Sequence, residues 1–112
     1  MSQLTTHVLD TALGKPAAGI AIRLYSLVDG NQQLMAEGIT NADGRVPQFL
    51  PTGQLLEPAA YKLVFETGAY FKSAGRSVFY PVVEVSFNIA DSSHYHVPLL
   101  LSPFGFSTYR GS

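Results

Sequence analysis

Residues 94–101 read HYHVPLLL, and this stretch decides the fold class because its side chains separate into two sets at alternate positions. Successive side chains of a β-strand point to opposite faces, so each set belongs to one face. One set is apolar throughout and predicts a face that packs into a core: Tyr95, Val97, Leu99 and Leu101. The other set is mixed and then faces outward: His94, His96, Pro98 and Leu100. The stretch therefore predicts a half-buried strand with two histidines on its outer face.

The rest of the chain also consists of short β-prone segments, with runs of Val, Ile, Leu, Phe and Tyr between turns that contain Gly and Pro. Such punctuation is typical of an all-β sandwich. Eight strands, enough for two four-stranded sheets, are expected at residues 4–10, 20–28, 33–40, 45–49, 61–66, 82–88, 94–101 and 104–110. Asp29 and Gly30 have the residue types of a tight hairpin turn. One short helix is expected at 67–75, with Thr67 as its N-cap and Gly75 as its C-terminal stop.

Composition limits the classes of function that remain open. A chain of 112 residues, 46% of them hydrophobic and 13% charged, is expected to form a single domain spanning residues 1–112. The net charge of -1 and the absence of a basic stripe argue against nucleic-acid binding. The chain has no cysteine, which excludes disulfides and thiolate chemistry. No signal-peptide pattern and no membrane-spanning stretch is visible, so a cytoplasmic location is expected.

Two further strands place polar residues on outward faces. In residues 4–10, Leu4 and Val8 are assigned to the core, so Thr5, His7 and Leu9 point outward. In the last strand, Phe104 and Phe106 are expected to continue the core face. If the three strands are neighbours, one outward surface carries His7, His96, Ser107 and Tyr109 among the apolar residues Leu9, Pro98 and Leu100. A mixed patch of this kind favours a binding site or a subunit interface, and oligomerisation is expected.

The candidate chemistry on this surface is an imidazole and guanidinium set formed by His7, His96 and Arg45. Histidine titrates near neutral pH and can take a proton from water, while arginine stays cationic and can hold a planar carbonyl through two hydrogen bonds. His94-x-His96 together with His7 could also hold a metal, although a strand His-x-His without a carboxylate is more often two surface histidines. Ser107 lacks a nucleophile elbow, and no phosphate or calcium loop is present. The pattern alone does not join these residues into one site.

Four segments together resemble the 5-hydroxyisourate hydrolases, also called transthyretin-related proteins. They are LTTHVLDTALGKP at 4–16, NADGRVP at 41–47, HYHVPLLLSP at 94–103 and YRGS at 109–112. The resemblance runs along essentially the whole chain. It implies a transthyretin-like (prealbumin-like) β-sandwich of two four-stranded sheets with one short helix. It also implies a homotetramer, a dimer of dimers, with active sites at subunit interfaces.

The same resemblance implies a reaction and its residues. The expected activity is hydrolytic ring opening of 5-hydroxyisourate, at a cyclic amide C–N bond, to 2-oxo-4-hydroxy-4-carboxy-5-ureidoimidazoline in urate breakdown. No cofactor and no metal is implied. The catalytic positions fall on His7, Arg45 and His96, with Tyr109, Arg110, Gly111 and Ser112 as substrate-binding residues. Which histidine acts as the general base stays open.

Two rival functions share this framework. The first is a transthyretin-like carrier of a small hydrophobic ligand. Transthyretins, however, have Lys in place of His7, an acid in place of Arg45 and an apolar tail in place of YRGS. The second is a metal-dependent hydrolase that uses all three histidines, which loss of activity on chelation would reveal.

Overall fold

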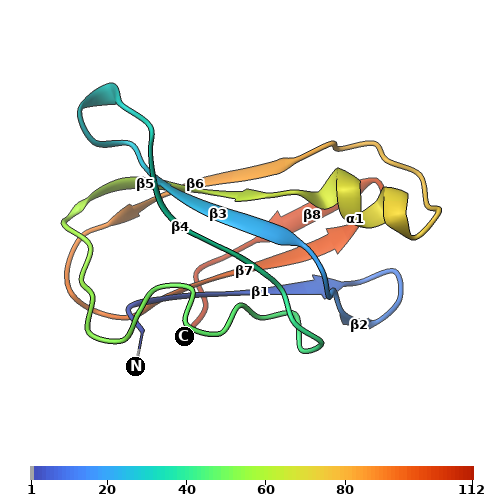
Figure 1. Cartoon of the computed structure of the whole chain (residues 1–112), viewed down its shortest axis with the longest axis horizontal. Coiled ribbons are helices and arrows are strands. Elements are labelled where there is room, and N and C mark those ends of the chain that lie inside the picture. Colours follow the sequence, from blue (N-terminus) through green and yellow to red (C-terminus); the bar gives the residue numbers. More distant parts are fainter. Residues whose placement is uncertain (1) are drawn as a thin grey trace.

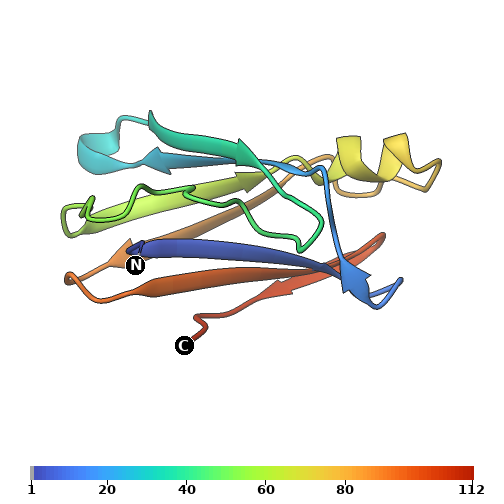
Figure 2. The same cartoon turned by 60° about the horizontal axis from the view of Figure 1, so that its bottom comes forward.

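Two four-stranded sheets pack face to face in the computed structural model, which describes residues 2–112 (Figure 1, Figure 2). The first sheet has the order β2-β1-β7-β8 and consists of β1 (Leu4–Asp10), β2 (Lys15–Pro16), β7 (Tyr95–Ser102) and β8 (Gly105–Thr108). The second has the order β4-β3-β5-β6 and consists of β3 (Ala21–Ser26), β4 (Gln33–Ile39), β5 (Ala59–Phe65) and β6 (Val83–Ile89). Only β1 and β7 pair in parallel; the other strand pairs of the described residues are antiparallel. The expected all-β sandwich is confirmed.

The core lies between the two sheets and is built from alternate positions of the strands. Tyr95, Val97, Leu99 and Leu101 of β7 are at most 6% exposed, as the alternation in HYHVPLLL predicts. Leu4 and Val8 of β1 are fully buried beside them. The opposite sheet contributes Ile22, Leu24, Leu63 and Phe65. Because β1 and β7 bury one face completely, their other face is fixed on the outside of the sandwich.

A short helix lies between β5 and β6 of the second sheet, at the end of the sandwich where the β1–β2 turn also lies (Figure 1, Figure 2). This helix, α1 (Thr67–Ser73), stops before Gly75, whose φ of +69° is a conformation that suits glycine. Thr67 is not the N-cap as expected. It lies inside the first turn, fully buried, where its hydroxyl donates to the Tyr80 carbonyl at 3.2 Å. No helix in residues 2–112 is long and apolar enough to cross a membrane.

The hairpin between β3 and β4 contains the turn residues that the sequence indicates. A 3₁₀ turn, η1 (Val28–Gly30), follows β3, and its Asp29 and Gly30 have φ values of 56° and 73°. The expected positive-φ pair is therefore present, within a longer connection than a two-residue turn.

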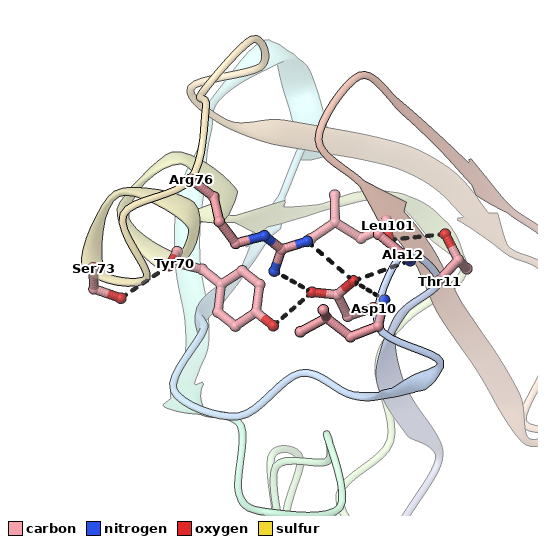
Figure 3. Close-up of polar contacts among 8 residues, drawn as sticks. Asp10, Thr11, Ala12, Tyr70, Ser73, Arg76 and Leu101 are labelled. Atoms are coloured by element: carbon pink, nitrogen blue, oxygen red, sulfur yellow. Dashed lines mark hydrogen bonds and ion pairs between the residues drawn. The ribbon is translucent and has the colours of Figure 1, made fainter.

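A fully buried carboxylate, Asp10 at the end of β1, fastens α1 to the first sheet (Figure 3). Its Oδ2 accepts hydrogen bonds from the Tyr70 hydroxyl and the Arg76 Nη1, both at 2.7 Å. Its Oδ1 accepts the backbone N–H groups of Ala12 and Leu13 at 3.1 Å, which closes the β1–β2 turn. Burial alone would raise the pKa of Asp10, but the bonds from Arg76 and Tyr70 outweigh burial and hold that pKa below its ordinary value.

The strand expected at 45–49 is wrong, because this segment is a loop that pairs with β1 only through an isolated bridge between Arg45 and His7. Pro47 has no N–H to give to a sheet, and Gln48 has a φ of 54° that leaves the extended region. The apolar residues of the segment still enter the core, since Phe49 and Leu50 are buried. The fourth strand of the first sheet is instead the two-residue β2, which folds back on β1 after Gly14.

The last strand is shorter than the expected 104–110, and its phenylalanines are not core residues. Phe106 lies opposite Leu101 in the register, on the inner face, yet it is 42% exposed, and Phe104 is 68% exposed. The reason is that β8 is the edge strand of its sheet. Phe106 packs edge-on against Tyr80, and Phe104 lies near Phe79 on the surface.

Candidate active site

The parallel pairing of β1 with β7 places the outward residues of both strands side by side. Thr5 lies opposite His96 and His7 lies opposite Pro98 in the register, while Ser107 of β8 lies opposite Leu100. The side chains of His7 and His96 are half-buried. The predicted outward surface with both histidines is therefore present on one face of the first sheet.

Arg45 reaches this surface because its loop is fastened to β1. The backbone of Arg45 forms an isolated antiparallel bridge with His7, and the Val8 N–H donates to the Gly44 carbonyl at 2.9 Å. The loop can approach so closely only with glycine at position 44, since a Cβ there would lie 2.4 Å from the Val8 carbonyl oxygen. In the turn around Gly44, Oδ1 of Asn41 accepts hydrogen bonds from the backbone N–H groups of Asp43 and Arg45. The structure thus brings Arg45 beside His7, a proximity that the strand pattern alone did not indicate.

Electrostatics link the three residues. Burial and then the Arg45 charge lower the pKa of His7, while the backbone and the carboxylate of Asp43 act in the opposite direction. Burial, then Arg45, and then the other two histidines lower the pKa of His96. Both imidazoles are therefore neutral at pH 7 and able to accept a proton.

Of residues 109–112, Gly111 contacts both the backbone and the ring of His96. Its N–H donates to the His96 carbonyl at 2.7 Å, in an isolated bridge that continues the β7–β8 pairing. A Cβ at position 111 would lie 2.6 Å from Cδ2 of His96, so only glycine fits against the imidazole ring without a shift. Ser112 follows and is exposed.

Within this chain, Arg110 contacts Tyr95 and the His94 backbone rather than a histidine side chain, and Tyr109 is 57% exposed. The Arg110 guanidinium stacks over the Tyr95 ring at 4.0 Å and donates to the His94 carbonyl at 3.1 Å. Tyr109 lines a hollow of about 360 Å³ with Val85 and Phe87 of β6. Gly111 takes the His96 side of the sheet, so alternation turns its neighbour Arg110 away from that side.

One polar contact of the site was not foreseen. The Thr5 hydroxyl lies between two imidazoles, 3.0 Å from Nε2 of His94 and 2.8 Å from Nδ1 of His96. Alternation places Thr5 on the outward face, but only the register of two strands far apart in sequence shows which residue it meets. His94, expected to be structural or on the surface, is a neighbour of the site through this hydroxyl.

The histidines do not assemble into a metal-binding set within residues 2–112. No group of three His, Asp or Glu side chains there could hold one ion together. His94 and His96 stack with their ring planes at 16° and their centroids 6.5 Å apart, with the Thr5 hydroxyl between two of their nitrogens. What the surface offers chemically is two neutral imidazoles beside one guanidinium.

Comparison with known proteins shows the family. The HIUase/Transthyretin family model matches residues 4–111. The chain belongs to the HIUase/Transthyretin family. The 5-hydroxyisourate hydrolase 2 of Rhizobium meliloti is 53% identical over 98% of this chain and 96% of the relative. The family resemblance expected from the four sequence segments is confirmed.

Solved structures of this family show the same sandwich. The Klebsiella pneumoniae 5-hydroxyisourate hydrolase matches with a TM-score of 0.85 and 40% identity, over 99% of this chain and all of that one. Sea bream transthyretin in complex with thyroxine matches with a TM-score of 0.90 and 31% identity, over 97% of this chain and 94% of that one. Because both resemble it so well, the fold alone does not separate the hydrolases from the transthyretins.

Proposed function

We propose that this family member is a 5-hydroxyisourate hydrolase, which opens the six-membered ring to 2-oxo-4-hydroxy-4-carboxy-5-ureidoimidazoline in urate breakdown. The observation that carries the proposal is the meeting of Arg45 with His7 and His96 on the outer face of β1 and β7. The full-length relative that is 53% identical bears the name of this activity. The whole of residues 1–112 would act as one hydrolase domain.

The residues divide the work as follows. One of the two neutral imidazoles removes a proton from water as the water attacks a ring carbonyl of the substrate. Arg45 orients the substrate through its planar guanidinium and stabilises the negative charge that develops on the carbonyl oxygen. The proton then reaches the leaving ring nitrogen as the C–N bond breaks. Residues 109–112 would shape the pocket around the substrate, with Gly111 against the His96 ring.

The test is to generate 5-hydroxyisourate in place with urate oxidase and to follow its ultraviolet decay with and without the protein. The proposal expects acceleration that Arg45→Ala, His7→Asn and His96→Asn each reduce by about 10²-fold or more. Arg23→Ala is the matched control, because Arg23 pairs with Glu66 on the other sheet. Absence of acceleration by the unaltered protein would end the proposal.

The reaction is proposed to need no metal or other cofactor, since an imidazole base and a guanidinium supply proton transfer and charge stabilisation. Overnight treatment with a chelator should leave the rate unchanged. A rate that disappears on chelation and returns with zinc would replace this mechanism with a metal-dependent one.

A homotetramer, a dimer of dimers, is proposed as the working form. In one chain the histidine surface is open, and it carries the half-buried apolar residues Leu9 and Leu100 beside the histidines. A second copy laid over this face would enclose the substrate and exclude bulk water. The proposed compartment is the cytoplasm.

A further inference from the structure

The Thr5 hydroxyl forms a bridge between two histidine rings. Its oxygen lies 3.0 Å from Nε2 of His94 and 2.8 Å from Nδ1 of His96, both ordinary hydrogen-bond lengths. The arrangement follows from the backbone, because Thr5 is the register partner of His96 in the parallel pair and His94 lies two residues before His96 on the same face.

Counting protons restricts what this bridge can be. A threonine hydroxyl has one proton to donate and lone pairs to accept with. A neutral imidazole has one nitrogen that donates and one that accepts. If the hydroxyl donates to His94, then Nδ1 of His96 must carry a proton and donate to the hydroxyl. If the hydroxyl donates to His96 instead, the proton of that ring is on Nε2.

The two arrangements differ in whether His96 can act as a base. Thr5 occupies Nδ1 of His96, so Nε2 is the nitrogen left to meet water. Nε2 has a free lone pair only when Nδ1 carries the proton. When Nε2 of His94 accepts the hydroxyl proton, that proton is kept away from His96, which favours this form.

We propose that Thr5 and His94 are positioning residues that hold the His96 imidazole in its Nδ1-protonated form, with Nε2 as the general base. The inference rests on the proposed hydrolase function and names which of the two histidines takes the proton from water. It also gives His94 a part in the site through Thr5.

His7 is held differently. No side chain bonds to its ring within residues 2–112, and a hydrogen bond with the Asp43 backbone acts on the ring instead, whereas His96 has the Thr5 hydroxyl on Nδ1 and Gly111 against its carbon edge. A general base is usually fixed in orientation by a second group that holds its other nitrogen. Of the two rings, His96 is held by a hydroxyl that a second histidine also contacts, so the base is assigned to His96 and substrate contact to His7.

The first readout needs no turnover. A long-range ¹H–¹⁵N spectrum of the imidazole rings at pH 7.5 to 8 distinguishes a protonated nitrogen from a bare one. In the unaltered protein, His96 should show a protonated Nδ1 and a bare Nε2. Thr5→Val keeps the shape of the side chain and removes its hydroxyl, so a fraction of His96 should change to the Nε2-protonated form. His94→Leu should have the same effect, because the Thr5 hydroxyl is then free to donate to Nδ1 of His96.

The second readout is kinetic. Thr5→Val should lower kcat by at least about tenfold with little change in KM, because it removes part of the base catalysis and not the substrate contacts. Thr5→Ser, which restores a hydroxyl, should recover both kcat and the nitrogen pattern. Thr6→Val is the matched control, since the Thr6 hydroxyl donates to the Val97 carbonyl on the buried face.

Two results would overturn the proposal: a bare Nδ1 on His96 in the unaltered protein, or a Thr5→Val variant with unchanged kcat and unchanged His96 nitrogens. If Thr5→Val does not fold, the unaltered spectrum and His94→Leu still decide. If the unaltered protein shows no hydrolysis, the function fails, while the His96 spectrum separately decides the tautomer.

Discussion

Burial lowers the pKa of both His7 and His96, and the Arg45 charge lowers it further. A histidine acts as a base only while its ring is unprotonated. Both rings should therefore be neutral above pH 6.5, and the activity should fall only as the pH drops below that value. The pH profile of kcat/KM should therefore have its acid limb below 6.5.

Removing the Arg45 charge should raise the pKa values of both histidines. In Arg45→Gln the imidazolium forms of His7 and His96 lose a repulsive neighbour, so their pKa values should rise. Titration of the ring signals by nuclear magnetic resonance measures this without turnover. Unchanged pKa values for both rings would mean that Arg45 does not act on them electrostatically.

Gly111 controls the position of the His96 ring. A methyl group at 111 would lie 2.6 Å from the ring, so Gly111→Ala must displace either the imidazole or residues 109–112. We expect kcat to fall at least about tenfold, as for a small misplacement of a catalytic group. The melting temperature should stay close to that of the unaltered protein, because the bridge lies outside the core. Gly105→Ala is the control, since the nearest atom to its added methyl group would be 3.7 Å away. Equal activity of the two variants would mean that Gly111 does not control the position of the His96 ring.

Sequence reasoning found the histidines but not their contacts. Alternation along β7 was enough to turn His96 outward, because one face of that strand is plainly apolar. The inner face of β1 mixes Leu4 and Val8 with Thr6 and Asp10, so the outward direction of His7 rested on the two apolar residues alone. The approach of Arg45, the bridge through Thr5 and the packing of Gly111 all depend on which residues pair across strands. One strand's pattern does not encode its register with another strand.

The helix is held to the first sheet by the ion pair between Arg76 and the buried Asp10. Arg76→Ala would leave that carboxylate with only Tyr70 and two backbone N–H groups, and losing one partner of a buried pair costs about 3 kcal/mol. Chemical denaturation should show this loss at pH 7. Lys62→Met is the control, because its partner Glu84 is 52% exposed and such pairs contribute about 0–1 kcal/mol.

The acid dependence of this pair has a definite sign. The folded-state pKa of Asp10 lies below its ordinary value of 3.8, so the carboxylate stabilises the fold fully above that value. The contribution is lost as the pH falls through the lower, folded-state pKa. A stability gap between the unaltered protein and Arg76→Ala that persisted undiminished at pH 2 would contradict the ionic origin.

Elements whose apolar residues recur at a clear strand or helix spacing were predicted well, and segments without such a spacing were not. β1, β7 and α1 follow their patterns closely, whereas the 45–49 strand and the buried Phe104 and Phe106 were wrong. In the loop, apolar side chains serve the core from irregular backbone. In β8, the position at a sheet edge leaves its inner face partly uncovered, and edge position is a property of topology rather than of local sequence.

The whole sandwich is shared with proteins of different names, since a hydrolase and a thyroxine-bound transthyretin both superpose well on it. Function must therefore lie in the residues on the outer face of the first sheet rather than in the fold. An open sheet face gives poor exclusion of water, so the proposed chemistry needs a cover. A second copy of the chain is the cover that the tetramer proposal supplies.

Leu100 tests whether assembly and activity are one property. It lies on the outer face of β7, two residues beyond Pro98 and opposite Leu9 and Ser107. Leu100→Glu would bury a carboxylate in the proposed interface, so light scattering should show loss of the four-chain species, and hydrolysis per chain should fall with it. Leu34→Glu, at a leucine that is 47% exposed in β4, the edge strand of the other sheet, should change neither property. Full activity in a monomeric Leu100→Glu variant would mean that one chain encloses its substrate unaided, and the interface would then have no part in the reaction.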